Sequence, residues 1–170
     1  MFRAILQLRG GRGLGGLDGA AQAGMIKQEV SMLKSLESAY IVARYEPIVV
    51  PCHCGNECCN GYINNKVWID AMGKLSVHIR NSVLLHCATT TPMRMDYIMR
   101  FLPYCKYASI AALANKHGIS EKTVRNHVKE VRKFFLGKVV DGIRQAGLEE
   151  RAMTAITDRL EQAGIIGNDV

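Results

Sequence analysis

Apolar residues recur every three or four positions through most of the chain, which predicts a mainly α-helical fold. In the first such segment they are Ile26, Val30, Leu33, Leu36, Tyr40 and Ala43. We expect a single helix there, ended by Pro47 and Pro51, with the apolar residues between the two prolines extended. A second helix is predicted by Val67, Trp68, Ala71, Met72, Leu75 and Ile79. Trp68 lies on that apolar face, so we expect it and Tyr62 to pack in the core rather than stack on a base.

The second half of the chain carries further helix signals. Thr91 is a candidate N-cap, and Pro92 suits the first position of the helix that follows. Its apolar residues are Met95, Ile98, Met99 and Leu102. Two more helices flank the sequence His-Gly-Ile-Ser at 117–120, and a last one spans roughly 148–163 before Gly164. No segment shows strong strand alternation.

The pair of helices around residues 117–120 has the pattern of a helix-turn-helix. Ala114 provides the small residue that a close helix crossing needs, and Gly118 tolerates a left-handed turn. Ser120 can cap the second helix by accepting a hydrogen bond from the amide of Thr123. The expected buried face consists of Leu113, Ile119, Val124, Val128 and Val131. His127 departs from the pattern, because an apolar residue is more usual near that place.

The outward face of the second helix is rich in groups that bind bases and phosphates. We expect the DNA-binding residues to be Ser120, Glu121, Lys122, Arg125, Asn126, Lys129, Arg132 and Lys133. Between Cys105 and Lys138 there are eight basic and two acidic residues, so this stretch holds most of the net charge of +7. The alternative is an ordinary helical hairpin with a solvated basic face.

The stretch from Arg94 to Phe135 resembles the fourth conserved region of sigma factors and related regulators. The match lies at Ala114, Gly118, Ser120 and Thr123–Val124, and covers about a quarter of the chain. In that family a preceding helix leads into two DNA-binding helices. The resemblance therefore implies DNA binding, although it distinguishes poorly among the functions of such folds.

Four of the six cysteines are crowded together, which is typical of metal binding in a cytosolic chain. The expected zinc ligands are Cys52, Cys54, Cys58 and Cys59. Four ligands on one short loop would be cramped. A site that uses two or three of them with His78, His86 or Cys87 is an alternative, and so is a set of reduced cysteines that only fill space.

The order of these features resembles small prophage regulators of the late-gene antitermination class. The likeness rests on a cysteine-rich loop containing Cys-Cys-Asn-Gly-Tyr at 58–62, then a helix with Trp68, then the sigma-like unit. This resemblance implies a protein that binds phage DNA and acts with the bacterial RNA polymerase. Relatives of this layout vary in their cysteines.

Four regions are expected along the chain. Residues 1–24 contain seven glycines and little apolar periodicity, which predicts a disordered tail or a translated leader ahead of a true start at Met25. Residues 25–90 form a helical region with the cysteine-rich loop, 91–140 the DNA-binding region, and 141–170 the C-terminal helix. No apolar run is long enough to span a bilayer or form a secretory signal, so we expect a cytoplasmic protein.

Several functions fit this reading. The favoured one is a DNA-binding transcription regulator of the antitermination type, with duplex DNA and RNA polymerase as partners. A conventional dimeric repressor or activator is the first alternative, and a DNA-processing factor such as a small terminase subunit is the second. No paired carboxylates or nucleophile–base set can be named, so we do not expect an enzyme. The oligomeric state is left open by the sequence.

Overall fold

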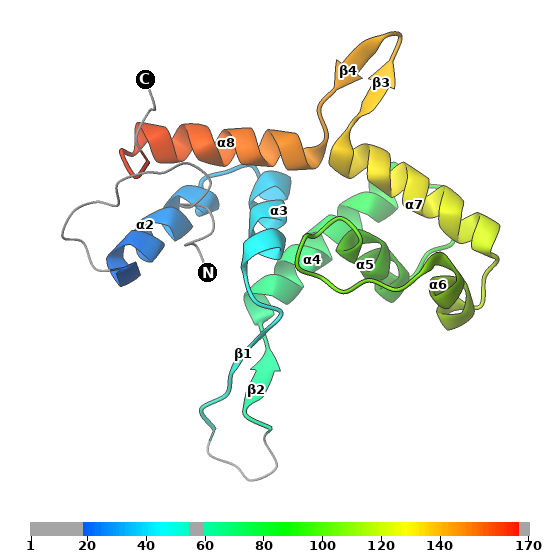
Figure 1. The fold of residues 1–170 in the computed structure, drawn as a ribbon, viewed down its shortest axis with the longest axis horizontal. Coiled ribbons are helices and arrows are strands. Elements are labelled where there is room, and N and C mark those ends of the chain that lie inside the picture. Colours follow the sequence, from blue (N-terminus) through cyan, green and yellow to red (C-terminus); the bar gives the residue numbers. More distant parts are fainter. Residues whose placement is uncertain (1–18, 55–59, 167–170) are drawn as a thin grey trace.

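The computed structural model describes residues 19–54 and 60–166. The predicted fold class is confirmed, because this part of the chain is mainly helical and adds two short β-hairpins. No helix in the described ranges is both long enough and apolar enough to cross a membrane. Figure 1 shows helix α8 (Leu148–Gln162) lying across one side of the molecule, with α3 descending from it and the expected helix-turn-helix at one end.

The first predicted helix is two helices, α2 (Gly19–Ser31) and α3 (Ser35–Tyr45). The chain breaks at Lys34, whose backbone is extended (φ −56°, ψ 147°). Ser31 promotes this ending, because its hydroxyl donates to the carbonyl of Gln28 within the last turn of α2. The break lets α2 pack on α8 while α3 packs on α4 as well as α8. Periodicity alone missed it, since the apolar spacing continues through the bend.

Helix α2 begins at Gly19, ahead of the boundary expected at Met25. Residues 19–24 therefore belong to a helix rather than to a disordered tail. Ile26, in the next turn, is fully buried and ties α2 to the core. Residues 1–18 lie outside the described part of the chain.

A hairpin of β1 (Val49–Pro51) and β2 (Tyr62–Asn64) precedes helix α4 (Lys66–His78). The extended segment near Pro51 is thus confirmed. The indole of Trp68 is buried and donates to the carbonyl of Ala43 at 3.1 Å, as expected of a core residue. Tyr62 is 60% exposed, so the prediction that it packs in the core was wrong. A π-helical segment, η1 (Ile79–Val83), extends α4.

Helix α5 (Thr91–Met99) begins one residue earlier than predicted, because Thr90 caps it rather than Thr91. Arg94 is buried in its first turn, and its side chain donates to the hydroxyl of Ser76 at 3.0 Å. This bond holds the start of α5 beside the end of α4. The last predicted helix is confirmed as α8, and Gly164 follows it with a left-handed φ of 67°.

The core is continuous between the two ends of the molecule. Phe135, near the end of helix α7 (Glu121–Leu136), is fully buried. Its ring stacks on Phe101 at 5.4 Å between centroids and lies 5.9 Å from the ring of Tyr40 in α3. These contacts fix the end of α7 against the rest of the fold.

A second hairpin, β3 (Lys138–Val140) and β4 (Ile143–Gln145), follows α7 directly. It was not predicted, although the sequence contains its signal. Asp141 and Gly142 form the turn with φ of 51° and 77°. Positive φ at both central residues defines the tight turn for which Asp-Gly is favoured. Figure 1 shows this hairpin projecting from the junction of α7 and α8.

Candidate nucleic-acid interface

The turn between α6 (Ile110–His117) and α7 has the geometry expected of a helix-turn-helix. Gly118 ends α6 in the left-handed conformation, with φ 65° and ψ 33°. The amide of Ile119 then donates to the carbonyl of Ala114 at 3.1 Å, which closes the end of α6. Ser120 caps α7 as predicted, because its hydroxyl accepts from the amide of Thr123 at 3.1 Å.

The inward side of this unit is mostly as predicted. Leu113, Ala114, Val124 and Val131 are buried, whereas Ile119 and Val128 are half-buried. His127 occupies the core position itself, since it is buried. A hydrogen bond of 3.3 Å joins the Nδ1 of His127 and the hydroxyl of Tyr97.

Burial lowers the pKa of His127 below its ordinary value of 6.5, because the charged ring would be poorly solvated. As the pH falls through about 6.5, the imidazole of His127 therefore takes up a proton more readily in the unfolded chain than in the folded one. We expect the free energy of unfolding to drop between about pH 7.5 and pH 5.5, and to drop less steeply in His127→Gln. Urea unfolding at a series of pH values measures this, and parallel curves for the two proteins would refute it.

The buried carboxylate of Asp96 on α5 holds the last turn of helix α6 in place. Asp96 is 8% exposed, and one of its oxygens lies 2.7 Å from both the Nζ of Lys116 and the Nε2 of His117. Both residues sit in the last turn of α6, where positive charge also suits the helix dipole. This contact sets the position of the turn relative to α5.

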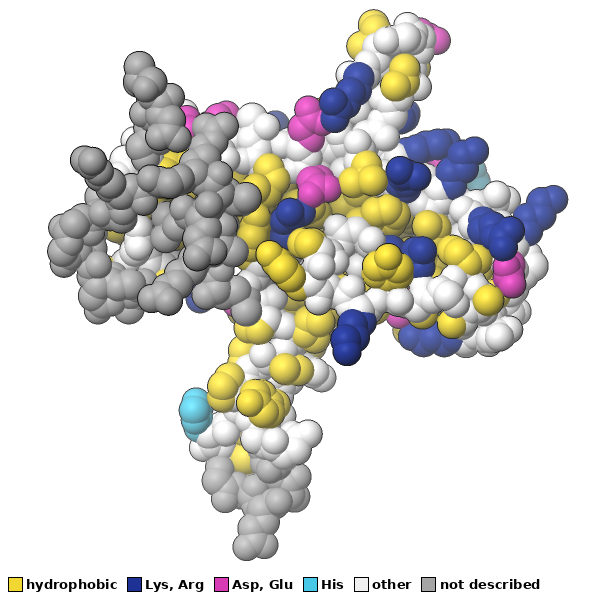
Figure 2. All heavy atoms as spheres, viewed as in Figure 1, with side chains coloured by type: hydrophobic (Ala, Val, Ile, Leu, Met, Phe, Trp, Pro, Cys, Tyr) yellow, Lys and Arg dark blue, Asp and Glu magenta, His cyan; other side chains and the backbone are white. Residues whose placement is uncertain are grey.

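The predicted DNA-binding residues lie together on the outward face of α7 and its cap. Seven of the eight are exposed and Lys133 is half-buried: Ser120, Glu121, Lys122, Arg125, Asn126, Lys129 and Arg132 are the exposed ones. Figure 2 shows Lys and Arg side chains gathered at this end of the molecule. The predicted set is therefore one continuous surface.

Two of these basic side chains form ion pairs with acidic residues of the same helix. Arg125 lies 2.6 Å from Glu121, and Lys133 lies 2.7 Å from Glu130, each within α7. Both are solvent-accessible pairs, which contribute little to stability and exchange readily for another anion. Within the described ranges no ion pair involves Lys122, Lys129 or Arg132.

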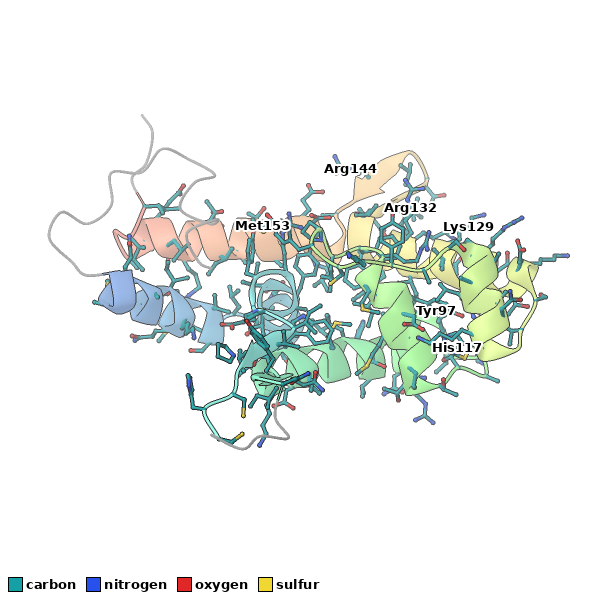
Figure 3. The ribbon with its side chains drawn as sticks, turned by 60° about the horizontal axis from the view of Figure 1, so that its bottom comes forward. Tyr97, His117, Lys129, Arg132, Arg144 and Met153 are labelled. Carbon is teal, nitrogen blue, oxygen red and sulfur yellow. The ribbon has the colours of Figure 1, made fainter. Side chains whose placement is uncertain are left out.

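A shallow groove of about 400 Å³ runs from α7 to the β3–β4 hairpin. We call it the α7 groove; it is lined by Lys129, Arg132, Lys133, Leu136, Gly137, Lys138, Val139 and Arg144. Figure 3 shows Lys129, Arg132 and Arg144 along one edge of the molecule. Lys138 and Arg144 were absent from the predicted site, because the hairpin that carries them was not recognised.

The described part of the cysteine-rich segment, which contains Cys52 and Cys54, directly follows strand β1. Cys52 is half-buried and Cys54 is exposed, while Cys58 and Cys59 lie outside the described residues. The amide of Cys52 donates to the carbonyl of Gly61 at 2.8 Å and continues the strand ladder. Among residues 19–54 and 60–166, no group of three or more potential metal ligands is found.

The alternative zinc ligands are far from the β1–β2 hairpin. Helix α4 begins just after β2 and ends at His78, about 20 Å away along its axis. The bond between Arg94 and Ser76 shows that the loop before α5, which holds His86 and Cys87, also lies at that end. Within residues 19–54 and 60–166, these three residues therefore form no metal-ligand group with Cys52 and Cys54.

Zinc on the cysteine hairpin itself remains a prediction. If Cys54 and Cys58 are ligands, Cys54→Ser and Cys58→Ser should each lower the zinc content from about one atom per chain towards zero. Cys105→Ser is a matched control, since Cys105 lies after α5. Elemental analysis of protein purified without chelator measures this. A zinc content far below one atom in the unsubstituted protein would show that the cysteines hold no metal.

Comparisons with known proteins give one partial match. No protein-family model matches it, and no solved structure does. A stretch of 57 residues is 35% identical to a histone-lysine N-methyltransferase specific for H3 lysine-36, from Schizosaccharomyces pombe. That stretch covers 34% of this chain and 7% of the methyltransferase. So small a share of the larger protein establishes neither common family nor common activity.

Proposed function

We propose that this protein is a DNA-binding transcription regulator that reads duplex DNA with the exposed face of α7. One observation carries the proposal. Helix α7 has an exposed basic face, and the turn that precedes it has the geometry of a helix-turn-helix. Arg125, Asn126 and Lys129 follow one another along this face, where a recognition helix contacts base edges and phosphates. The excess of positive charge supports a polyanionic partner.

Selection from a random duplex library tests this proposal, since the target sequence is not known. The full chain, immobilised, should enrich one sequence class over successive rounds. Its affinity for the enriched duplex should exceed that for a scrambled duplex by a factor of about 10³ or more at physiological salt. Equal affinities for the two duplexes would refute sequence-specific regulation.

As the finer form of this proposal, the protein acts with the bacterial RNA polymerase as a prophage antitermination factor. The support is the resemblance of residues 94–135 to the sigma region and the order of the cysteine loop, Trp68 and that region. Capture of RNA polymerase subunits from bacterial extract by the immobilised full chain tests it. A stable dimer on a palindromic site without polymerase would favour a conventional repressor, and a ring-shaped assembly would favour a terminase subunit.

A further inference from the structure

The β3–β4 hairpin joins the end of α7 through close backbone packing. Its two ends meet at Gly137 and Gly147, where the backbones approach so closely that neither residue has room for a side chain. A Cβ on Gly147 would collide with the carbonyl of Phe135, and one on Gly137 would collide with the carbonyl of Gln145. The direction of the hairpin is therefore set by backbone packing against the recognition helix.

One face of the hairpin continues the basic side of α7. Val139 and Arg144 are cross-strand partners, so their side chains share a face. Both line the α7 groove together with Lys129 and Arg132. Val139 is 69% exposed, and the side chain of Arg144 is 71% exposed. Val139 is therefore an apolar side chain that is open to solvent beside a row of basic side chains.

Helix α7 is long enough that a duplex bound to its first half would also reach this hairpin. Its 16 residues extend about 24 Å, whereas the major groove is about 12 Å wide. With the first half of α7 in the groove, the second half lies over the phosphate backbone. Lys129 and Arg132 then face phosphates, and the backbone continues along the α7 groove towards Arg144.

We propose that the β3–β4 hairpin is a second DNA-contacting element, a wing, in which Arg144 binds a backbone phosphate and Val139 packs against the adjoining sugar. This inference rests on the proposed function of α7 and names a further contact with the same duplex. Arg144 forms an ion pair with Glu150 at 2.8 Å. Since both groups are exposed, a phosphate can replace the carboxylate.

The test uses variants of the full chain with a mixed-sequence DNA duplex of about 30 base pairs, near three helical turns. Arg144→Ala should weaken binding about eightfold at 0.1 M salt and lower the salt slope by about one, as expected for one lost phosphate contact. Glu150→Gln should tighten binding, because it releases Arg144. Arg151→Ala is the matched control, since Arg151 lies near the base of the hairpin but does not line the α7 groove. It should change the affinity less than twofold.

The outcomes separate the wing from the recognition helix. If Arg125→Ala/Lys129→Ala weakens binding while Arg144→Ala behaves like Arg151→Ala, the wing is refuted and the function of α7 stands. The same variants are also tested with single-stranded RNA of equal length. If Arg144→Ala weakens binding to this RNA but not to the DNA duplex, the wing is also refuted. If the unsubstituted chain does not bind the duplex, both proposals fail. Circular dichroism of each variant verifies that the fold is retained.

Discussion

Replacing both Arg125 and Lys129 with Ala is expected to weaken binding to the selected duplex about hundredfold. A side chain that reads a base contributes about 1–3 kcal/mol, and a lost phosphate contact adds nearly tenfold at moderate salt. Both side chains are exposed, and the pair between Arg125 and Glu121 lies within one helix. The fold should therefore be unaffected. Fluorescence anisotropy of a labelled duplex measures the affinity.

The single variants distinguish reading of bases from attraction to phosphate. Arg125→Ala should relax sequence preference, whereas Lys133→Ala should weaken all duplexes alike and flatten the salt slope. Lys74→Ala is the control, because Lys74 is an exposed lysine on α4 away from the predicted site. If Lys74→Ala weakens binding as much as Arg125→Ala, the effect is one of net charge and the assignment of α7 fails.

The largest expected effect on stability is that of Gly147→Ala. Its new methyl group would overlap the carbonyl of Phe135 and the amide of Gly137, so the junction of α7, the hairpin and α8 must shift. Overpacking of this kind costs about 3 kcal/mol when backbone has to move. In a chain of this length that corresponds to a fall of about 10 °C in Tm. Thermal unfolding followed by circular dichroism measures it.

Gly73→Ala provides the matched control for this prediction. Gly73 lies inside α4, and a Cβ there would meet nothing within 4 Å. Because alanine favours a helix over glycine by about 1 kcal/mol, this variant should be slightly more stable than the unsubstituted protein. Equal stability of the two alanine variants would contradict the close packing described at Gly147.

Local signals in the sequence were sufficient for the helix-turn-helix. The left-handed Gly118 and the capping Ser120 act within a few residues of their own positions, so their roles could be predicted without knowledge of the fold. The exposed face of α7 followed from the helical period and the apolar residues opposite it. The predicted surface therefore agrees with the structure at Arg125, Asn126 and Lys129.

Features that depend on tertiary contacts could not be predicted in this way. The break between α2 and α3 keeps the apolar spacing, and only packing on α8 and α4 reveals it. His127 is polar, yet a hydrogen bond with Tyr97 on α5 makes its burial acceptable. The β3–β4 hairpin differs, because Asp141-Gly142 is a local signal for its turn. The predicted interface lacks Arg144 because it does not include this hairpin.

The central claim, that the exposed face of α7 contacts DNA bases, is tested most directly by crosslinking. A photoreactive amino acid replaces Asn126 on α7 in one protein and Asp70, exposed on α4, in another. Each is irradiated with the selected duplex. We predict efficient crosslinking from position 126 to bases within the selected site and almost none from position 70. Equal yields from the two positions, or none from position 126 while the duplex is bound, would contradict the claim.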